Sequence, residues 1–182
     1  MITTIKELIA NHDIIASGFP AIADLSNYGT KGTPVHLTSL APTILLEQGI
    51  SEYYALELPR NTVFNNAEEI IAADLPVRKY CVSKVDNAAE LDAVIVSRHQ
   101  GTVNILKEQY PDAPVLENIM PADIKGKHVV GTLPPHLISS AGAYTPVTIK
   151  GFNYAVDGDL SGQELLDRMV ISNQAIKLVE VN

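Results

Sequence analysis

Residues 93–101 read Ala-Val-Ile-Val-Ser-Arg-His-Gln-Gly, and this stretch decides the fold class. Its first four residues are apolar and mostly β-branched, which is typical of a buried strand. The amphipathic segment 101–109 that follows predicts a helix, so Ser97, Arg98 and His99 lie at a strand-to-helix junction. Such units indicate an α/β protein, whose parallel strands are covered by helices on both faces.

The same alternation of short apolar runs and amphipathic stretches extends along the chain. The predicted strands are 13–17, 35–38, 53–58, 78–84, 93–97, 115–119, 128–131, 147–150 and 175–181. The predicted helices are 3–11, 21–25, 43–48, 67–73, 101–109, 135–141 and 161–169. We therefore expect an α/β fold with a mainly parallel, Rossmann-like sheet.

The two halves of the chain contain similar segments in the same order. Ile14-Ile15-Ala16-Ser17 resembles Val94-Ile95-Val96-Ser97, and Thr-Ser-Leu-Ala-Pro from residue 38 aligns with Thr-Leu-Pro-Pro from residue 132. This order predicts two tandem related βα halves. They are a degenerate Rossmann-like repeat over 1–86 and a second Rossmann-like domain over 93–182. The alternative is that any two βα segments look alike at this level.

Composition excludes several classes of protein. With 182 residues, 46% of them hydrophobic and 19% charged, the chain is neither a disordered tail nor too small for a core. A single cysteine, Cys81, excludes a disulfide scaffold. No apolar run approaches the roughly 20 residues of a membrane span, and the start lacks a secretory signal. We expect a soluble, cytoplasmic protein with no membrane partner.

The charge balance argues against duplex nucleic acid as a partner. The chain has 13 Lys and Arg against 21 Asp and Glu, a formal net charge of −8, and it contains no dense basic run. Binding to duplexes depends on many contacts from Lys and Arg to phosphate. Any anionic ligand is therefore expected to be small and held by a local site.

The first candidate site is the junction from Ser97 to Gly101. Ligands of open α/β sheets bind beyond the carboxyl ends of the strands, and the N–H groups at a helix start favour an anion. Arg98 can bind phosphate, Ser97 can donate a hydrogen bond, and the imidazole of His99 can transfer a proton. The alternative is a polar loop that only caps the helix.

The second candidate site is Gly131-Thr132-Leu133-Pro134-Pro135-His136, another strand end followed by a helix start. Gly131 allows close approach of backbone, Pro135 suits the first helical position, and Thr132 and His136 present polar groups. A structural turn would explain the same residues without a ligand.

Other motifs predict no cofactor or metal. There is no Gly-x-Gly-x-x-Gly sequence and no Cys/His cluster with the spacing of metal ligands. Asp157 and Asp159 are predicted to form a turn. Cys81 lies within a predicted strand, where a buried and inert thiol is expected.

Three segments of the second half form a recognisable pattern. They are Val-Ser-Arg-His-Gln-Gly-Thr at 96–102, Gly-Thr-Leu-Pro-Pro-His-Leu at 131–137, and Gln-Glu-Leu-Leu at 163–166. Residues 93–181 resemble the small CRISPR-associated ring-nuclease family, which reads roughly Val-Ser-Arg-His-Pro-Gly-Ala, then Gly-Thr-Leu-Pro-x-x-Leu, and ends in a Glu-Leu helix and a strand. Gln100 replaces the usual Pro, and the Arg-Gly pair expected before the last helix is absent.

The resemblance implies a fold related to CARF domains, and an enzyme that binds and cleaves a cyclic oligoadenylate, usually the ring of four adenylates. Cleavage would need no metal or cofactor and would switch off or evade type III CRISPR signalling. Arg98 and His99 would be catalytic. The ligand-binding residues would be Ser97, Gly101, Gly131, Thr132, Leu133, Pro135 and His136.

Two further questions stay open at the level of the sequence. Members of the family bind their ligand across a two-fold dimer, so this chain would form either an internal pseudo-dimer of its two halves or a homodimer. The alternatives to an enzyme are a phage sponge that sequesters a cyclic nucleotide messenger, and a structural subunit of a phage or host assembly that keeps the Rossmann-like fold without its activity. The protein would act in the bacterial cytoplasm, or be a phage protein in the infected host.

Overall fold

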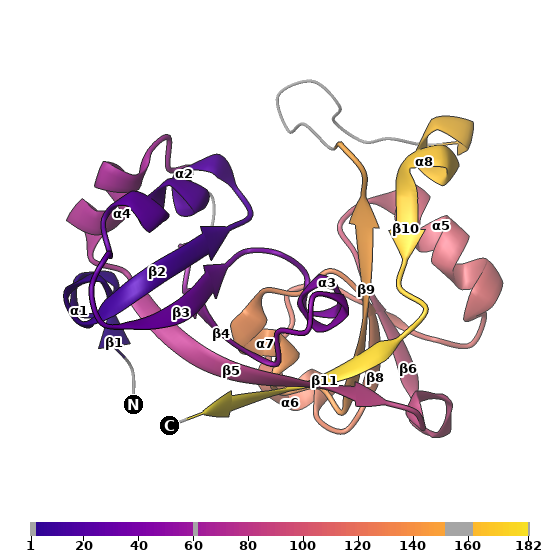
Figure 1. Cartoon of the computed structure of the whole chain (residues 1–182). Coiled ribbons are helices and arrows are strands. Elements are labelled where there is room, and N and C mark those ends of the chain that lie inside the picture. Colours follow the sequence, from indigo (N-terminus) through magenta and orange to yellow (C-terminus); the bar gives the residue numbers. More distant parts are fainter. Residues whose placement is uncertain (1–2, 60–61, 152–161, 182) are drawn as a thin grey trace. The chain divides into compact units, whose positions relative to one another are not determined.

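The structure is a computed structural model that describes residues 3–59, 62–151 and 162–181. It divides into two compact units (Figure 1). Unit 1 comprises Met1–Val82 and Val179–Asn182, and unit 2 comprises Ser83–Leu178. The chain leaves unit 1 within strand β5 (Pro76–Val85) and returns to it within strand β11 (Ala175–Val181).

Unit 1 is built on a sheet with the strand order β2-β3-β4-β5. Strands β2, β3 and β4 are parallel, whereas β5 is antiparallel to β4 and pairs with the short β1 on its other side. In chain order its elements before β5 are β1 (Thr3–Thr4), α1 (Ile5–Asn11), β2 (His12–Ser17), α2 (Pro20–Ala23), the 3-10 helix η1 (Asp24–Asn27), β3 (Thr33–Thr38), α3 (Pro42–Glu47), β4 (Glu52–Leu56) and α4 (Ala67–Ala73).

Local sequence explains where the helices of unit 1 begin. Thr4 precedes α1, its hydroxyl accepts the Glu7 N–H, and the Glu7 carboxylate accepts the Thr4 N–H, which forms a capping box. Asn66 caps α4 by accepting the Glu69 N–H at 2.9 Å. The apolar faces of α1 and α4 contribute Leu8 and Ile70 to one core cluster with residues of the sheet. Amphipathic periodicity therefore located both helices correctly.

Unit 2 has the strand order β11-β9-β8-β6-β7. Strands β7, β6, β8 and β9 are parallel, and β10 and β11 are antiparallel to β9. In chain order its elements before β11 are the 3-10 helix η2 (Ala88–Glu90), β6 (Ala93–Val96), α5 (Gln100–Gln109), β7 (Val115–Leu116), α6 (Pro121–Ile124), β8 (His128–Gly131), α7 (Pro135–Ile138), β9 (Ala143–Ile149), α8 (Gly162–Arg168) and β10 (Met169–Ile171).

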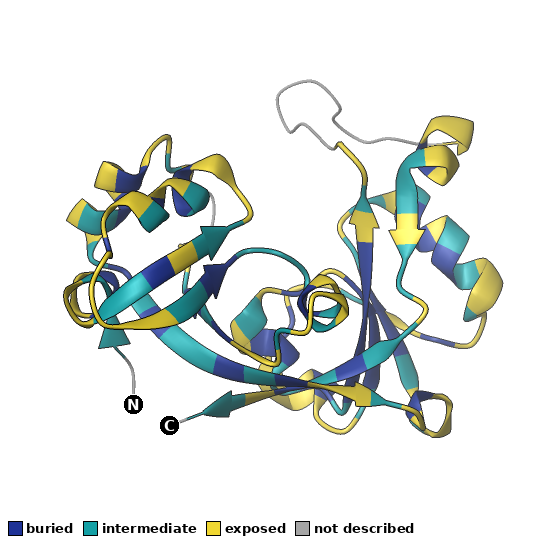
Figure 2. Ribbon diagram, in the orientation of Figure 1, coloured by how far each residue is buried: buried dark blue, intermediate teal, exposed yellow. Residues whose placement is uncertain are grey.

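The central strands of unit 2 are buried on both faces (Figure 2). Ile95, Val130 and Val147 from three neighbouring strands pack with Val103 and Leu106 of α5 in one core cluster. Near-continuous apolar runs such as residues 93–96 are typical of this environment, because helices cover both faces of a parallel sheet.

The strand order of unit 2 reverses between β6 and β8. From β6 the chain crosses to β7 on one side, whereas from β8 it crosses to β9 on the other. Since crossovers between parallel strands are right-handed, α5 and α7 are placed on opposite faces, as Figure 1 shows. The carboxyl ends of β6 and β8 therefore form a topological switch point, where open α/β sheets bind ligands. In unit 1, β2, β3 and β4 follow one another without a reversal.

The predicted α/β class with mostly parallel strands is confirmed. The segment predicted as a strand at 147–150 instead belongs to β9, which already begins at Ala143. The sequence did not indicate this earlier start, because the first five residues of β9 are all buried and so show no alternation of apolar and polar residues. The helix predicted to reach residue 141 ends at Ile138, and the segment predicted as a helix to residue 169 ends at Arg168 and continues as β10.

Both units contain two parallel pairings followed by an antiparallel one, along β2-β3-β4-β5 and β6-β8-β9-β11. The origin of the units by duplication, and their Rossmann-like ancestry, stay predictions. Across the described part of the chain, no helix has both the length and the apolar character needed to cross a bilayer.

Candidate functional site

The ends of β6 and β8 bring the two sequence motifs together. Val96 pairs with Gly131 in the last position of the parallel ladder, and the Thr132 N–H donates to the Val96 carbonyl oxygen at 3.1 Å. Ser97 and Thr132 therefore follow neighbouring strand ends directly. This position is the switch point of unit 2, so the structure places both motifs where a ligand is expected.

Gly131 is required at this point by geometry. Its φ of +142° is rarely adopted by residues with a side chain, and a Cβ would overlap the carbonyl oxygen of Val96. Glycine therefore allows β8 to end in close contact with β6, which sets the position of the turn that follows.

The turn after β8 is held from within unit 2 by Tyr144. The buried Tyr144 hydroxyl accepts the Leu133 N–H at 3.1 Å and donates to the Gly131 carbonyl oxygen at 3.0 Å. Burial raises the pKa of Tyr144 far above its ordinary value, so the hydroxyl keeps its proton. Leu133 itself is buried, so neither its side chain nor its N–H is available to a ligand in this state.

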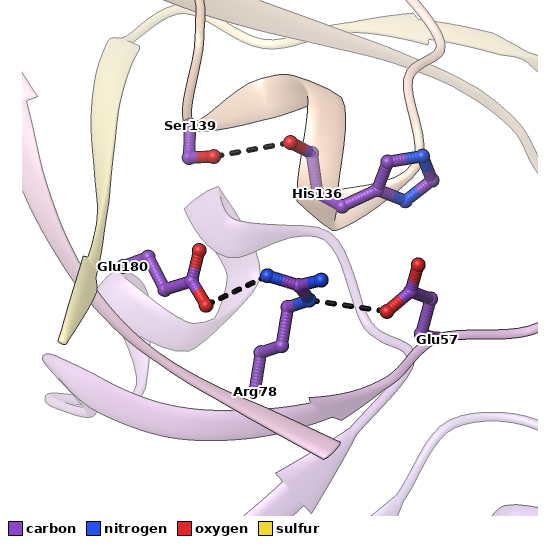
Figure 3. A network of polar contacts seen from close by, with 5 residues as sticks. All are labelled: Glu57, Arg78, His136, Ser139 and Glu180. Atoms are coloured by element: carbon purple, nitrogen blue, oxygen red, sulfur yellow. Dashed lines mark hydrogen bonds and ion pairs between the residues drawn. The ribbon is translucent and has the colours of Figure 1, made fainter. Parts of the chain in front are cut away.

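Thr132 is an exposed member of this turn. Its Oγ1 donates to the carbonyl oxygen of Val147 on β9 at 3.1 Å. Pro135 is half-buried at the first position of α7, and His136 is exposed in the same short helix. The His136 carbonyl accepts a hydrogen bond from Ser139 Oγ at 3.1 Å, as Figure 3 shows.

The start of α5 presents unpaired N–H groups beside the first motif. His99 is the N-cap and its side chain does not cap the helix, while its N–H donates to Ser97 Oγ at 3.2 Å. Val103 donates to the His99 carbonyl, whereas the N–H groups of Gln100, Gly101 and Thr102 have no acceptor among the described residues. A ten-residue helix with free N–H groups attracts anions at this end.

Arg98 supplies a cation next to these N–H groups. Its side chain is exposed, and it makes no ion pair or hydrogen bond with any residue that the structure describes. The neighbouring Gln100 side chain is engaged, because its Nε2 donates to Asn104 Oδ1 at 2.8 Å. Arg98 is therefore the cation at this junction that can pair with an incoming anion.

Arginine is used differently in unit 1. Arg78 Nε lies 3.1 Å from Glu57 Oε2 and Arg78 Nη1 lies 2.9 Å from Glu180 Oε1, as Figure 3 shows. Hydrogen bonds to Glu180 and then Glu57 raise the pKa of this guanidinium. Both carboxylates are occupied within unit 1, so Arg78 has a structural role.

Two cavities of unit 2 lie at the opposite, amino ends of its strands. One of about 460 Å³ is lined by Asp92, Tyr110 and Lys127, and one of about 290 Å³ is lined by His128 and Thr145. Burial lowers the pKa of His128, whose Nε2 lies 2.7 Å from Thr145 Oγ1. No cluster of His, Cys, Asp and Glu able to hold a metal occurs in the described segments. Asp157 and Asp159 lie outside the described residues.

Sequence reasoning missed Tyr144 and Thr102. Tyr144 lies in an apolar stretch without a motif, and only the pairing of β8 with β9 brings its hydroxyl to the turn. Thr102 is 4% exposed, and its Oγ1 has no hydrogen-bond partner among the described residues. The signal for Thr102 is a hydroxyl on the buried face of α5, which it shares with Val103 and Leu106.

Comparison with known families places this site within a matched segment. Residues 94–178 match the family described as "Putative CRISPR-associated protein (Cas_VVA1548)". This match supports a CRISPR-associated protein. It covers β6, β8 and both motifs, whereas the elements of unit 1 up to β5 lie outside it. No curated protein and no solved structure matches the chain.

Proposed function

We propose that the protein binds a cyclic oligoadenylate at the carboxyl ends of β6 and β8 and cleaves it without a metal ion. The observation that carries this proposal is that Arg98 and three N–H groups of α5, at the switch point of unit 2, have no partner among the residues that the structure describes. The match of this unit to a CRISPR-associated family supports a role in type III CRISPR signalling, which cleavage of the messenger would switch off.

The phosphate-binding part of the site is the start of α5. Free N–H groups at a helix start and an arginine fork both favour a phosphate over a neutral ligand. The start of helix α7 offers fewer N–H groups to a phosphate, because Pro135 has no N–H and the Leu137 N–H already donates to the Pro134 carbonyl. We therefore assign the reacting phosphate to Arg98 and α5. This local cationic site suits a small polyanion in a protein of net charge −8.

The proposed reaction transfers a phosphoryl group within the ring. The 2′-oxygen of one ribose attacks the adjacent phosphorus, a new P–O2′ bond forms, and the P–O5′ bond breaks. The products are a 2′,3′-cyclic phosphate and a 5′-hydroxyl, so the proton lost from the 2′-hydroxyl is balanced by the proton gained at O5′. Arg98 and the α5 N–H groups stabilise the charge on the phosphate, and His99 transfers a proton.

The test is incubation of the protein with labelled cyclic tetra-adenylate in the presence of EDTA. Linear products support the proposed enzyme. Tight binding of an intact ring contradicts cleavage and favours a sponge that sequesters the messenger. Neither binding nor cleavage of a panel of cyclic nucleotides would contradict the proposed function as a whole.

Arg98→Gln is expected to weaken binding of the ring by about tenfold to a hundredfold, because a charge-assisted contact to phosphate is lost. Lys125→Gln is the matched control, since Lys125 is another exposed cation of unit 2 and forms no ion pair with the described residues. Both variants change the net charge equally. Equal affinities of the two variants for the ring would contradict a role of Arg98 in phosphate binding.

A further inference from the structure

We infer that Thr132 Oγ1 accepts a hydrogen bond from a ribose 2′-hydroxyl of the ligand and so selects ribonucleotides over deoxyribonucleotides. This inference rests on the proposed function of the same site. It assigns Thr132 to sugar recognition rather than to phosphate binding, and it assigns Tyr144 as the residue that positions Thr132.

The hydrogen bonds of Thr132 decide which groups it can recognise. A threonine hydroxyl has one proton and two lone pairs, and here the proton is donated to the Val147 carbonyl oxygen at 3.1 Å. Thr132 is exposed, and any further partner of its Oγ1 must be a hydrogen-bond donor. A phosphate ester at neutral pH presents oxygens without protons, so it is not a partner for this oxygen, whereas a hydroxyl group is.

The backbone of the same turn supports this assignment. The Thr132 N–H donates to Val96, and the Leu133 N–H donates to the Tyr144 hydroxyl, so neither can bind an anion. At the start of α5 the situation is the reverse, because three N–H groups there have no acceptor within the described part of the chain. The two strand ends thus divide into a donor side at α5, suited to phosphate, and an acceptor side at Thr132, suited to a hydroxyl.

Thr132 is also held in place by several hydrogen bonds, as selection of a ribose over a deoxyribose requires. Its N–H is bound by β6, its hydroxyl by β9, and the residues on either side of it by the Tyr144 hydroxyl. Tyr144 is 4% exposed and cannot touch the ligand. It acts as a positioning residue, because removal of its hydroxyl leaves the Leu133 N–H without an acceptor in a buried place.

The 2′-hydroxyl is the group that such an acceptor would select. It is the only donor that distinguishes a ribonucleotide from a deoxyribonucleotide. A 2′-hydroxyl that donates to Thr132 keeps its proton there, so the hydroxyl bound by Thr132 belongs to a ribose of the ring other than the one whose 2′-oxygen attacks.

The experiment compares the affinities for cyclic tetra-adenylate and its 2′-deoxy analogue, both measured in a His99→Ala background that slows turnover. We expect the ribose ring to bind about tenfold more tightly, the order of one hydrogen bond. Thr132→Val should bring this ratio close to one, and Thr132→Ser should restore most of it. A ratio that Thr132→Val leaves unchanged would overturn the inference while the proposed function stands.

Tyr144→Phe tests the positioning role. We expect this variant to bring the affinity ratio close to one, as Thr132→Val does, and to speed hydrogen exchange at the Leu133 amide. Tyr80→Phe is the control, because it removes a hydroxyl from a buried tyrosine of unit 1. Unchanged exchange at Leu133 would contradict the positioning role, whatever the ligand. Failure of both rings to bind the parent protein would instead contradict the proposed function, and with it the inference.

Discussion

At the scale of single residues, the candidate site depends on which polar groups are already paired. Arg98 and Ser97 belong to one strand end and Thr132 to the next, but their availability differs. Arg98 has no partner among the described residues, Ser97 Oγ already accepts the His99 N–H, and Thr132 has given its proton to Val147. Residue type alone would have assigned all three to phosphate.

Gly131→Ala is expected to destabilise the protein by about 3 kcal/mol or more, because the new Cβ overlaps the Val96 carbonyl and φ is positive. Gly126→Ala is the matched control: its φ is +72°, but a Cβ there meets no atom within 4 Å. Only the conformational cost of about 1–2 kcal/mol then applies. Urea unfolding measures both values, and equal losses would contradict the close approach of β8 to β6.

Thr102→Val is expected to raise the free energy of unfolding by about 1 kcal/mol. The Thr102 hydroxyl is buried without a partner among the described residues, and an unpaired buried hydroxyl destabilises a fold by roughly 1–3 kcal/mol. Valine keeps the shape and the branching at Cβ. Thermal or urea unfolding would show the gain, and a clear loss of stability would indicate that the hydroxyl has a partner in solution.

At the scale of elements, the paired strands β8 and β9 carry both the turn of the candidate site and a buried histidine contact. Their carboxyl-terminal part carries the turn with Thr132 and its partner Val147, whereas their amino-terminal part buries His128 against Thr145. His128 is the first residue of β8 and Gly131 is the last, and in the parallel register they align with Ala143 and Pro146 of β9. The two ends can therefore be tested separately.

The His128–Thr145 pair predicts how stability depends on pH. Burial lowers the pKa of His128 below 6.5, so between that lowered value and 6.5 the unfolded chain binds a proton that the folded chain does not. This contribution is present above pH 6.5 and is lost as the pH falls below it.

Urea unfolding at several pH values from 7.5 to 5 measures this effect, because the range extends below 6.5, the ordinary pKa of histidine. His128→Gln should lose less stability over that range than the parent protein does. His136→Gln, a change at an exposed histidine of the same unit, should behave like the parent protein. A parent protein whose loss of stability matches that of His128→Gln would contradict a lowered pKa.

At the scale of the whole molecule, acidic charge dominates, and the cation at the candidate site is an exception to it. The formal net charge is −8, with 21 acidic and 13 basic residues. Arg78 is neutralised by Glu57 and Glu180, whereas Arg98 is left available at a strand end. This contrast is what we expect of a protein that holds a small anion at one place and repels long polyanions.

Net charge also predicts a salt dependence of stability. Repulsion among excess carboxylates destabilises the compact state, and salt screens it over about 10 Å at 0.1 M. The melting temperature at pH 7.5 should therefore rise by a few degrees between low salt and about 0.2 M NaCl. A melting temperature that falls instead would show that ion pairs such as Arg78 with Glu180 outweigh the general repulsion.

Much of the fold and half of the site could be predicted from local pattern. The apolar run at 93–96 and the bounds of β8 were evident, because burial on both faces leaves a continuous signature in the sequence. The start of β9 was not, since Ala143 and Tyr144 carry no alternation that separates them from the preceding turn. The division of the chain into repeats stays a prediction.

By itself, the sequence determined the α/β class, the strand-to-helix junctions, and the presence of Arg98, His99 and Thr132 at those junctions, because periodicity and turn chemistry act between near neighbours in the chain. Only the tertiary structure decided that β6 and β8 are neighbours with the strand order reversing between them. It also decided that Val147 takes the proton of Thr132 and that Tyr144 holds the turn. These are contacts between different strands, and their register depends on how the whole sheet packs.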